Sequence, residues 1–280
     1  MTKYDKIIMV KTMAKIENKD KTISIFGISI WRILAYFIIY SFIGYIIETI
    51  FGFLTKGVLE SRQGFLYGPF CPIYGVGAVV MIVALQCFKK NIYTIFLGGF
   101  IVGSIVEYLV SFLGEVIFNV NWWDYSDKFL NINGRICVTF SLFWGILAIY
   151  LLKHFNPLVD KLIEKIKSKI STHMLKTIVA IGFTLLMLDF AMTGLALKVF
   201  FARTVYTYDL EVAKKEKYLK EYNNLLNNEA LAKTTNVVFS DEKMLKTFPN
   251  LKLKSEDGNI IYMDNILSHI QPYYFKFFEK

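Results

Sequence analysis

The sequence predicts an all-α polytopic membrane protein with five transmembrane helices and a small C-terminal α+β appendage. Hydrophobic residues make up 55% of the 280-residue chain and charged residues only 20%, whereas a soluble domain carries about 25% charged residues. The mean hydropathy is +0.43. The apolar residues are gathered in long runs, most of them close to the roughly 20 residues that a helix needs to cross a bilayer.

Five apolar runs qualify as transmembrane helices, in chain order 31–54, 71–88, 92–118, 136–152 and 175–201. The fifth is the weakest, because Asp189 lies near its middle and a carboxylate is costly in hydrocarbon. These runs divide the chain into a basic N-terminal segment (1–30), a helical bundle (31–202) and a polar appendage (203–280).

The lysines and arginines that flank the predicted spans are distributed unevenly. Most lie in the N-terminal segment and in the second and fourth loops, and few lie in the first and third loops. Basic loops stay in the cytoplasm, so we expect a multi-pass protein of the cell membrane with a cytoplasmic N-terminus. Five crossings would place the appendage outside.

The net charge of the chain is +9. Because many of the lysines lie beside apolar runs, we attribute this charge to contact with lipid headgroups and expect no nucleic-acid partner.

Two segments outside the spans have a recognisable pattern. Residues 158–170 alternate apolar side chains at helical spacing with lysines, which predicts either an amphipathic helix on the inner membrane surface or an extension of the fourth helix. In the appendage, 208–233 reads as a polar helix. Asp257-Gly258 predicts a β-hairpin between 251–254 and 259–262.

Carboxylates inside the predicted spans are the first candidates for a functional site, and they are Glu48, Glu107, Glu115 and Asp189. Glu107, Ser111 and Glu115 are spaced four residues apart, so they share one helix face. That face should point into the bundle, because lipid cannot solvate it. Gly99 and Gly103 predict close helix packing nearby.

Two arginines, Arg62 and Arg135, are expected at the outer mouth of the bundle, close to Glu48, Glu115 and Asp124. One interpretation is a polar cavity or translocation path that opens to the outside. The other is a set of structural ion pairs that hold the loops on the bundle. The sequence leaves both open.

The first outer loop and the start of the second run read RQGFLYGPFCPIYG over 62–75. Its glycines and prolines forbid a regular helix, yet it is too apolar for a free surface loop. We expect it to fold back into the bundle mouth, with Pro72 opening the second helix, or to form a packed turn. The residues singled out in it are Gly64, Gly68, Pro69, Cys71, Pro72, Tyr74 and Gly75.

The third outer loop contains Trp122 and Trp123, which predict either a position at headgroup depth or an aromatic substrate platform. A disulfide between Cys71 and Cys137 would be geometrically allowed. The sequence contains no P-loop, zincin, nucleophile-elbow or paired CxxC motif. We therefore expect no enzymatic activity, no cofactor and no metal. A membrane enzyme that uses paired carboxylates beside the tryptophans remains the third hypothesis.

Several of these motifs resemble the putative ABC-transporter type IV family of bacterial membrane proteins, also labelled CmpB-like permeases. They are Gly44 to Glu48, the run 62–75, Glu107, Glu115, 122–126 and Asn133-Gly134. The resemblance covers 36–155, so the fifth run and the tail lie outside it. Gln63 departs from the Asn-Arg-Gly that is usual in the family.

The resemblance implies a permease-like subunit that moves a small solute and depends on a separate ATPase subunit on the cytoplasmic side. Lys89-Lys90 and 158–170 would be the docking surfaces for that subunit. Besides membrane lipids, a second copy of the chain is a partner that the sequence leaves open. The alternative function is a membrane sensor, assembly factor or partner-binding protein that transports nothing.

Overall fold

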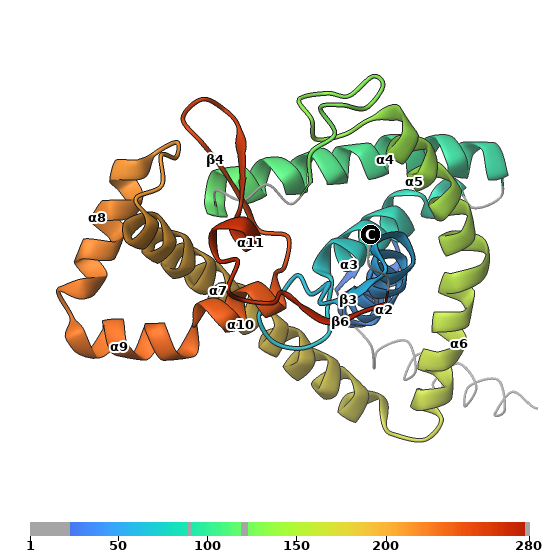
Figure 1. The fold of residues 1–280 in the computed structure, drawn as a ribbon. Helices are drawn as coiled ribbons and strands as arrows, with labels where there is room; N and C mark the ends of the chain where they lie inside the picture. Colours follow the sequence, from blue (N-terminus) through green and yellow to red (C-terminus); the bar gives the residue numbers. More distant parts are fainter. Residues whose placement is uncertain (1–22, 89–90, 119–122, 278–280) are drawn as a thin grey trace, which may run out of the picture.

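The computed structural model describes residues 23–88, 91–118 and 123–277. The basic segment up to residue 22, Lys89-Lys90 and Trp122 therefore lie outside the described residues. The described chain is mostly helical (Figure 1). Its helices long and apolar enough to cross a membrane are α2 (Ile30–Lys56), α4 (Ile92–Leu113) with its π-helical end η2 (Gly114–Phe118), α5 (Val138–Tyr150) continued by η3 (Leu151–Phe155) and α6 (Asn156–Lys167), and α7 (Thr172–Tyr208).

The prediction of five spanning helices is wrong, because four candidate spans are found in the described residues. The second apolar run contains only α3 (Pro72–Ala84), a helix of 13 residues, followed by the 3₁₀ turn η1 (Gln86–Phe88). At 1.5 Å per residue α3 extends about 20 Å, short of the roughly 30 Å of a hydrocarbon core. The hydropathy of the run 71–88 was sufficient, but its α-helix already ends at Ala84.

The segment before α3 and α3 itself together run back along the whole of α2. At the C-terminal end of α2, Lys56 pairs with Glu60 at 2.9 Å. Gln86, just past α3, donates from Nε2 to the carbonyl of Phe26, which precedes the N-terminal end of α2, at 3.1 Å. Residues 61–71 therefore form a re-entrant loop, and α3 is the half-helix that completes the passage.

Small residues bring α4 and α5 close together, as the sequence predicts. A Cβ at Gly99 would lie 2.3 Å from Cβ of Ala148, and one at Gly103 would lie 2.5 Å from the Trp144 side chain. A Cβ at Gly145 would lie 2.8 Å from the Phe96 ring. Substitution at these glycines would push the two helices apart.

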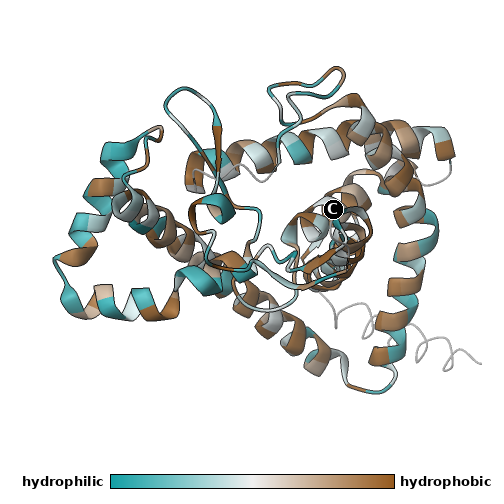
Figure 2. Ribbon diagram, in the orientation of Figure 1, coloured by the Kyte–Doolittle hydropathy of each residue, from teal (hydrophilic) through white to brown (hydrophobic). Residues whose placement is uncertain are grey.

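Helix α6 continues the fourth predicted helix through η3 without a break, and it is also amphipathic (Figure 2). Its apolar side, with Val159 and Ile163, is buried. Arg32 of α2 pairs with Glu164 at 2.7 Å and with Asp160 at 3.4 Å. The extension of the fourth helix is therefore confirmed, and the extension is amphipathic, whereas its position on the inner membrane surface stays a prediction. We call this side of the bundle the α6 end.

The C-terminal segment folds at the opposite end, which we call the tail end. Its elements are α8 (Lys215–Leu226), α9 (Glu229–Val238), α10 (Asp241–Thr247), β4 (Lys252–Lys254), β5 (Ile260–Tyr262), α11 (Met263–Ile266) and β6 (Tyr273–Lys276). Strands β4 and β5 form an antiparallel pair, and Gly258 has φ +82° in the connecting turn. The predicted hairpin is confirmed. The predicted polar helix is divided into α8 and α9, because Asn228 caps a new helix by accepting from the Leu231 amide.

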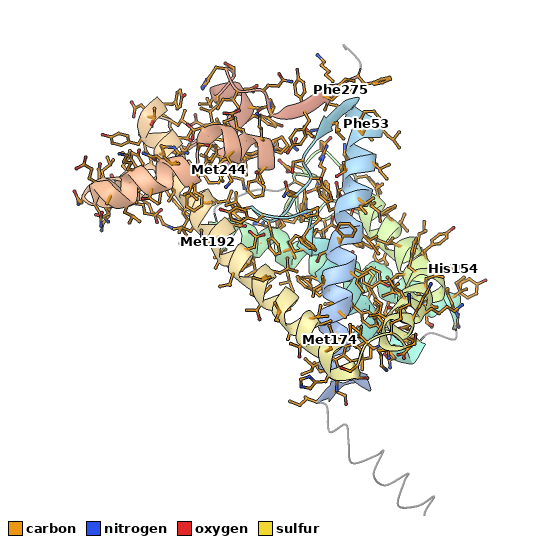
Figure 3. All side chains as sticks on the ribbon, turned by 90° about the horizontal axis from the view of Figure 1, so that it is seen from below. Phe53, His154, Met174, Met192, Met244 and Phe275 are labelled. Atoms are coloured by element: carbon orange, nitrogen blue, oxygen red, sulfur yellow. The ribbon has the colours of Figure 1, made fainter. Side chains whose placement is uncertain are left out.

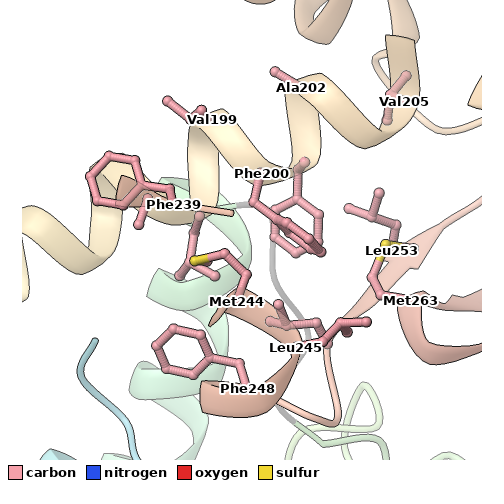
Figure 4. Close-up of a cluster of buried hydrophobic side chains, with 14 of the residues drawn as sticks. Val199, Phe200, Ala202, Val205, Phe239, Met244, Leu245, Phe248, Leu253 and Met263 are labelled. Carbon is pink, nitrogen blue, oxygen red and sulfur yellow. The ribbon is translucent and has the colours of Figure 1, made fainter. Parts of the chain in front are cut away.

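The tail shares its hydrophobic core with the last turns of α7. Phe200 on α7 is buried together with Met244, Leu245, Leu253 and Met263 of the tail (Figure 4). A second attachment is a strand pair: β3 (Val58–Glu60), directly after α2, pairs antiparallel with β6. The short strands β1 (Ser24–Ile25) and β2 (Ile28–Ser29) form a separate hairpin before α2. The tail is thus fixed on both α7 and α2.

Candidate functional site

The re-entrant loop is a compact, internally bonded turn. The Gly64 amide donates to the carbonyl of Phe70 at 2.9 Å, and Gln63 donates from Nε2 to the carbonyl of Gly68 at 2.6 Å. Gly68 has φ +76°, a conformation that favours glycine. Pro69 is exposed at the bend. Gln63, the residue that departs from the family pattern, therefore closes the loop.

On one side this loop is seated on the middle of α2. The Cys71 amide donates to the carbonyl of Ser41 at 2.8 Å, and α3 begins at the next residue, Pro72, as predicted. A Cβ at Gly75 would lie 2.2 Å from Ser41 Oγ, and one at Gly44 would lie 2.3 Å from Tyr74 Cβ. The two glycines allow α3 to lie directly against α2.

On the other side the loop is held by α7. The Tyr67 amide donates to both carboxylate oxygens of Asp189 at 3.1 Å, and the Leu66 amide donates to Thr193 Oγ1 at 2.8 Å. Asp189 is only 8% exposed. These amides explain why α7 tolerates a carboxylate near its middle. The sequence identified Asp189 as an intramembrane acid but missed its role, because no local pattern connects it with a loop 122 residues away.

Two further predicted carboxylates, Glu48 and Glu107, accept hydrogen bonds from neutral donors. Tyr74 Oη donates to Glu48 Oε1 at 2.8 Å. Glu107 is 4% exposed, and it accepts from Tyr125 Oη and from Trp144 Nε1, each at 3.0 Å. Glu107 faces the protein interior, as predicted, and Glu48 is half-buried. Their aromatic partners were missed, because they come from other segments of the chain.

Tyr125 is hydrogen-bonded to Glu107 and lies within the electrostatic reach of Glu48. Burial is the largest cause that raises the pKa of Tyr125 well above its usual value, followed by the Glu107 carboxylate and its hydrogen bond, and further by Cys137 and Glu48. The same phenol therefore lies in the field of both carboxylates. We call Glu48, Tyr74, Tyr125, Glu107 and Trp144 the acid pair cluster.

Nearer the tail end, Glu115 and Arg135 form an ion pair at 2.5 Å. Arg135 also donates to Ser111 Oγ at 3.2 Å, so three predicted residues do come together. Lys254 of the β4–β5 hairpin approaches the other oxygen of Glu115 at 3.4 Å. The sequence missed Lys254, because the hairpin is more than a hundred residues from Glu115.

Arg62 and Asp124 do not join Glu48 as predicted. Arg62 pairs with Glu60 at 2.6 Å, and Glu60 is 7% exposed and also bound to Lys56. Asp124 accepts from the backbone amide and the hydroxyl of Ser126, and this hydroxyl is the main cause that lowers the Asp124 pKa. The predicted single cluster at the mouth is therefore two ion-pair groups and a separate loop turn.

The remaining predicted loop residue, Trp123, donates from Nε1 to the carbonyl of Arg135 at 2.9 Å. It also stacks on Tyr125 with ring centroids 6.5 Å apart. It packs the third loop rather than offering a free aromatic platform. Cys71 and Cys137 are buried and free. In the described part of the chain no three His, Cys, Asp or Glu side chains gather as metal ligands.

Apolar helices, a re-entrant loop with a half-helix, and carboxylates turned inward define a multi-pass membrane protein. Figure 3 shows α2 and α7 extending from the α6 end, marked by His154 and Met174, towards the tail end, marked by Phe53 and Phe275. The chain belongs to the family described as "Putative ABC-transporter type IV", whose model matches residues 35–194. No curated protein and no solved structure gives a significant match.

The family match is longer than the resemblance recognised in the sequence, which ended at 155. It includes α7 up to Gly194. The expectation that the fifth apolar run lies outside the family is therefore wrong for most of that run. The matched part of α7 contains Asp189 and Thr193, which hold the re-entrant loop.

Proposed function

We propose that this chain is the permease-like membrane subunit of an ABC-type transporter, which moves a small solute across the cell membrane with a separate ATPase subunit. Membership of the family supports the general class. The single observation that carries the proposal is the acid pair cluster, with Glu48 and Glu107 held by neutral donors inside apolar helices. Ionisable groups at such depth are costly and usually mark a path for a solute or a proton.

In this proposal the re-entrant loop is the barrier of the path, seated on the middle of α2 and near the middle of α7. It is attached to α7 by hydrogen bonds to Asp189 and Thr193, which a small relative movement of α7 would break. A solute with a positive charge or several hydrogen-bond donors would then replace the Tyr74 and Tyr125 hydroxyls as the partner of the carboxylates.

The ATPase subunit would dock at the α6 end, which the proposal places in the cytoplasm together with the N-terminus. The apolar side of α6 packs inward, and its exposed face carries Lys161, Lys165, Leu158 and Leu162. Arg32 links α6 directly to α2. A movement of α6 on ATP binding would therefore reach α2, which carries Glu48. The chain itself would contribute no catalytic residue.

The test is ATP hydrolysis by the complex purified with the full chain from its native membranes. We expect an ATPase activity that co-purifies with the wild type and is lost in the double variant Lys161→Glu, Lys165→Glu. The matched control is Lys220→Glu, Lys233→Glu, which reverses the same charge in the tail. Full transport by the isolated chain in liposomes without ATP would contradict the proposal.

A second candidate function is a membrane sensor or partner-binding subunit that transports nothing. It is favoured by the closed tail end, where β6 pairs with β3 and Lys254 with Glu115. The double variant Glu107→Gln, Glu115→Gln separates the two functions. Loss of stability without loss of any solute flux would support the sensor, whereas a folded variant without flux would support the transporter.

A further inference from the structure

An apolar patch at the tail end joins the last turns of α2 to the last strand of the tail. The Phe53 ring packs edge-on against the Phe277 ring with centroids 6.1 Å apart, and the Phe277 ring packs in the same way against Phe275 at 6.0 Å. Figure 3 shows Phe53 and Phe275 together at this end. Leu59 lies opposite Phe275 in the β3–β6 pair, so the two side chains share one face of the ribbon. We call Phe53, Leu54, Leu59, Phe275 and Phe277 the aromatic patch.

The aromatic patch is exposed although it is apolar. Phe275 and Phe277 have 52% and 59% of their surfaces exposed, and Leu54 has 75%. A surface that faces water rarely gathers several large apolar side chains, and where it does the patch is usually covered by a partner or a membrane. The patch therefore needs a covering surface.

The lipid-facing side of α2 continues directly into the patch. The exposed apolar side chains in the second half of α2 are Ile46, Ile47, Ile50, Phe51 and Leu54. Their spacing of three and four residues places them in one stripe along the helix, and an exposed apolar stripe on a spanning helix faces acyl chains. Phe53 follows Ile50 by three residues and lies beside Leu54, so this stripe passes without a break onto the rings of Phe275 and Phe277.

The length of α2 places the patch at the edge of the bilayer. Trp31, at the α6 end, is a residue type that prefers the headgroup layer. Phe53 follows it by 22 residues, which is about 33 Å along a helix, and the hydrocarbon core is roughly 30 Å thick. Phe53 therefore reaches the opposite headgroup layer. Strand β6 also contains Tyr273 and Tyr274, and tyrosine is enriched at this depth.

We propose that the aromatic patch lies at the boundary between headgroups and acyl chains, where phospholipid covers it, and that β6 thereby anchors the tail to the membrane surface. Segments that lie in this layer bury phenylalanine and leucine at the same boundary. The unbroken stripe on α2 selects lipid as the occupant over a second copy of the chain. The patch contains no residue of the acid pair cluster, so this inference does not depend on the proposed transport.

The test uses the full wild-type chain in vesicles of phosphatidylcholine, part of which carries a photoreactive diazirine at the start of one acyl chain. After illumination, mass spectrometry of the peptides identifies the residues that carry lipid. We expect adducts in 273–277 and in 46–54 of α2. The hairpin tip 256–258 is also exposed but is polar, and it should carry none. Labelled α2 with unlabelled 273–277 would overturn the proposal.

A pair of variants tests the rings themselves. In Phe275→Ser, Phe277→Ser the labelling of 273–277 should fall about tenfold or more, and Phe275→Trp, Phe277→Trp should keep it. The matched control is Leu231→Ser, Val237→Ser, which removes two exposed apolar side chains from α9 of the same tail and should leave the labelling of 273–277 unchanged.

Labelling of 46–54 reports whether each variant is inserted, and the wild-type result stands even if the serine variant is not. Unchanged labelling of 273–277 in an inserted serine variant would overturn the anchoring role of the rings. Cross-linking of 273–277 to a second copy of the chain, in place of lipid, would overturn the assignment to lipid.

Discussion

Glu107 shows how a single buried carboxylate is satisfied in this protein. Its two oxygens accept from Tyr125 and Trp144, one donor from the third loop and one from α5. The helical spacing of Glu107, Ser111 and Glu115 was enough to predict that this face points inward. The identity of the donors was not predictable, because they depend on how distant segments pack.

Replacing Glu107 with glutamine turns one acceptor oxygen into an amide donor. Either Trp144 or Tyr125 then loses its acceptor in a buried site, and we expect the free energy of unfolding to fall by about 1–3 kcal/mol. Unfolding of the purified chain in detergent measures this change. Glu256→Gln, at the exposed tip of the tail hairpin, is the control and should have no effect. An equally small effect of both variants would contradict the hydrogen-bond assignment.

Asp189 gives a second prediction at this scale. In Asp189→Asn, one oxygen facing the Tyr67 amide becomes a donor, so the loop loses part of its attachment to α7. We expect faster hydrogen exchange at 64–70, with the α6 end unchanged. Thr193→Val should act in the same direction through the Leu66 amide. Asp257→Asn, in an exposed turn that accepts either residue, is the control. Unchanged exchange in both loop variants would show that α7 does not hold the loop.

The re-entrant loop and α3 show what hydropathy can and cannot predict about an element. The glycines and prolines of 62–75 were sufficient to predict an irregular segment followed by a helix that starts at Pro72. They left open whether the segment returns into the bundle or forms a packed turn. The number of spanning helices was wrong, because an apolar run reports the environment of the side chains and not whether the backbone is helical. Where such a backbone is buried in protein, the membrane tolerates it.

The contact between α3 and α2 depends on Gly75. In Gly75→Ala the new Cβ would lie 2.2 Å from Ser41 Oγ and 2.7 Å from the Phe37 carbonyl. The helices must separate, and we expect a loss of about 1–3 kcal/mol in the free energy of unfolding. Gly182→Ala on α7 is the matched control, because its Cβ meets only Ile38 Cδ1 at 3.4 Å. That variant should be neutral or more stable by up to about 1 kcal/mol. If Gly182→Ala were less stable than Gly75→Ala, the close contact between α3 and α2 at Gly75 would be contradicted.

At the scale of the whole molecule, the first loop, the third loop and the tail lie at one end, and α6 lies at the other. The asymmetry of basic residues predicted that the first and third loops share a side. The attachment of the tail through β3 and β6 could not be predicted, since three-residue and four-residue strands far apart in the sequence leave no pattern that pairs them.

Labelling with a membrane-impermeant thiol reagent tests this arrangement and its orientation. Single cysteines are introduced as Asp127→Cys, Ser255→Cys and Ser168→Cys in a chain without its native cysteines. We expect the first two to react in intact cells, and Ser168→Cys, beside α6, only after permeabilisation. Labelling of only one of the first two cysteines in intact cells would contradict the structure, which places both at the same end. Labelling of Ser168→Cys in intact cells would contradict the proposed cytoplasmic α6 end.

The pairing of β3 with β6 has a consequence for synthesis. More than two hundred residues separate the two strands, and at about 5–20 residues per second a ribosome needs roughly 10–40 seconds to produce them. During that interval β3 has an edge without its partner, directly beside the re-entrant loop, and such edges invite wrong pairing. We therefore expect the newly made bundle to need this edge shielded until the last strand emerges.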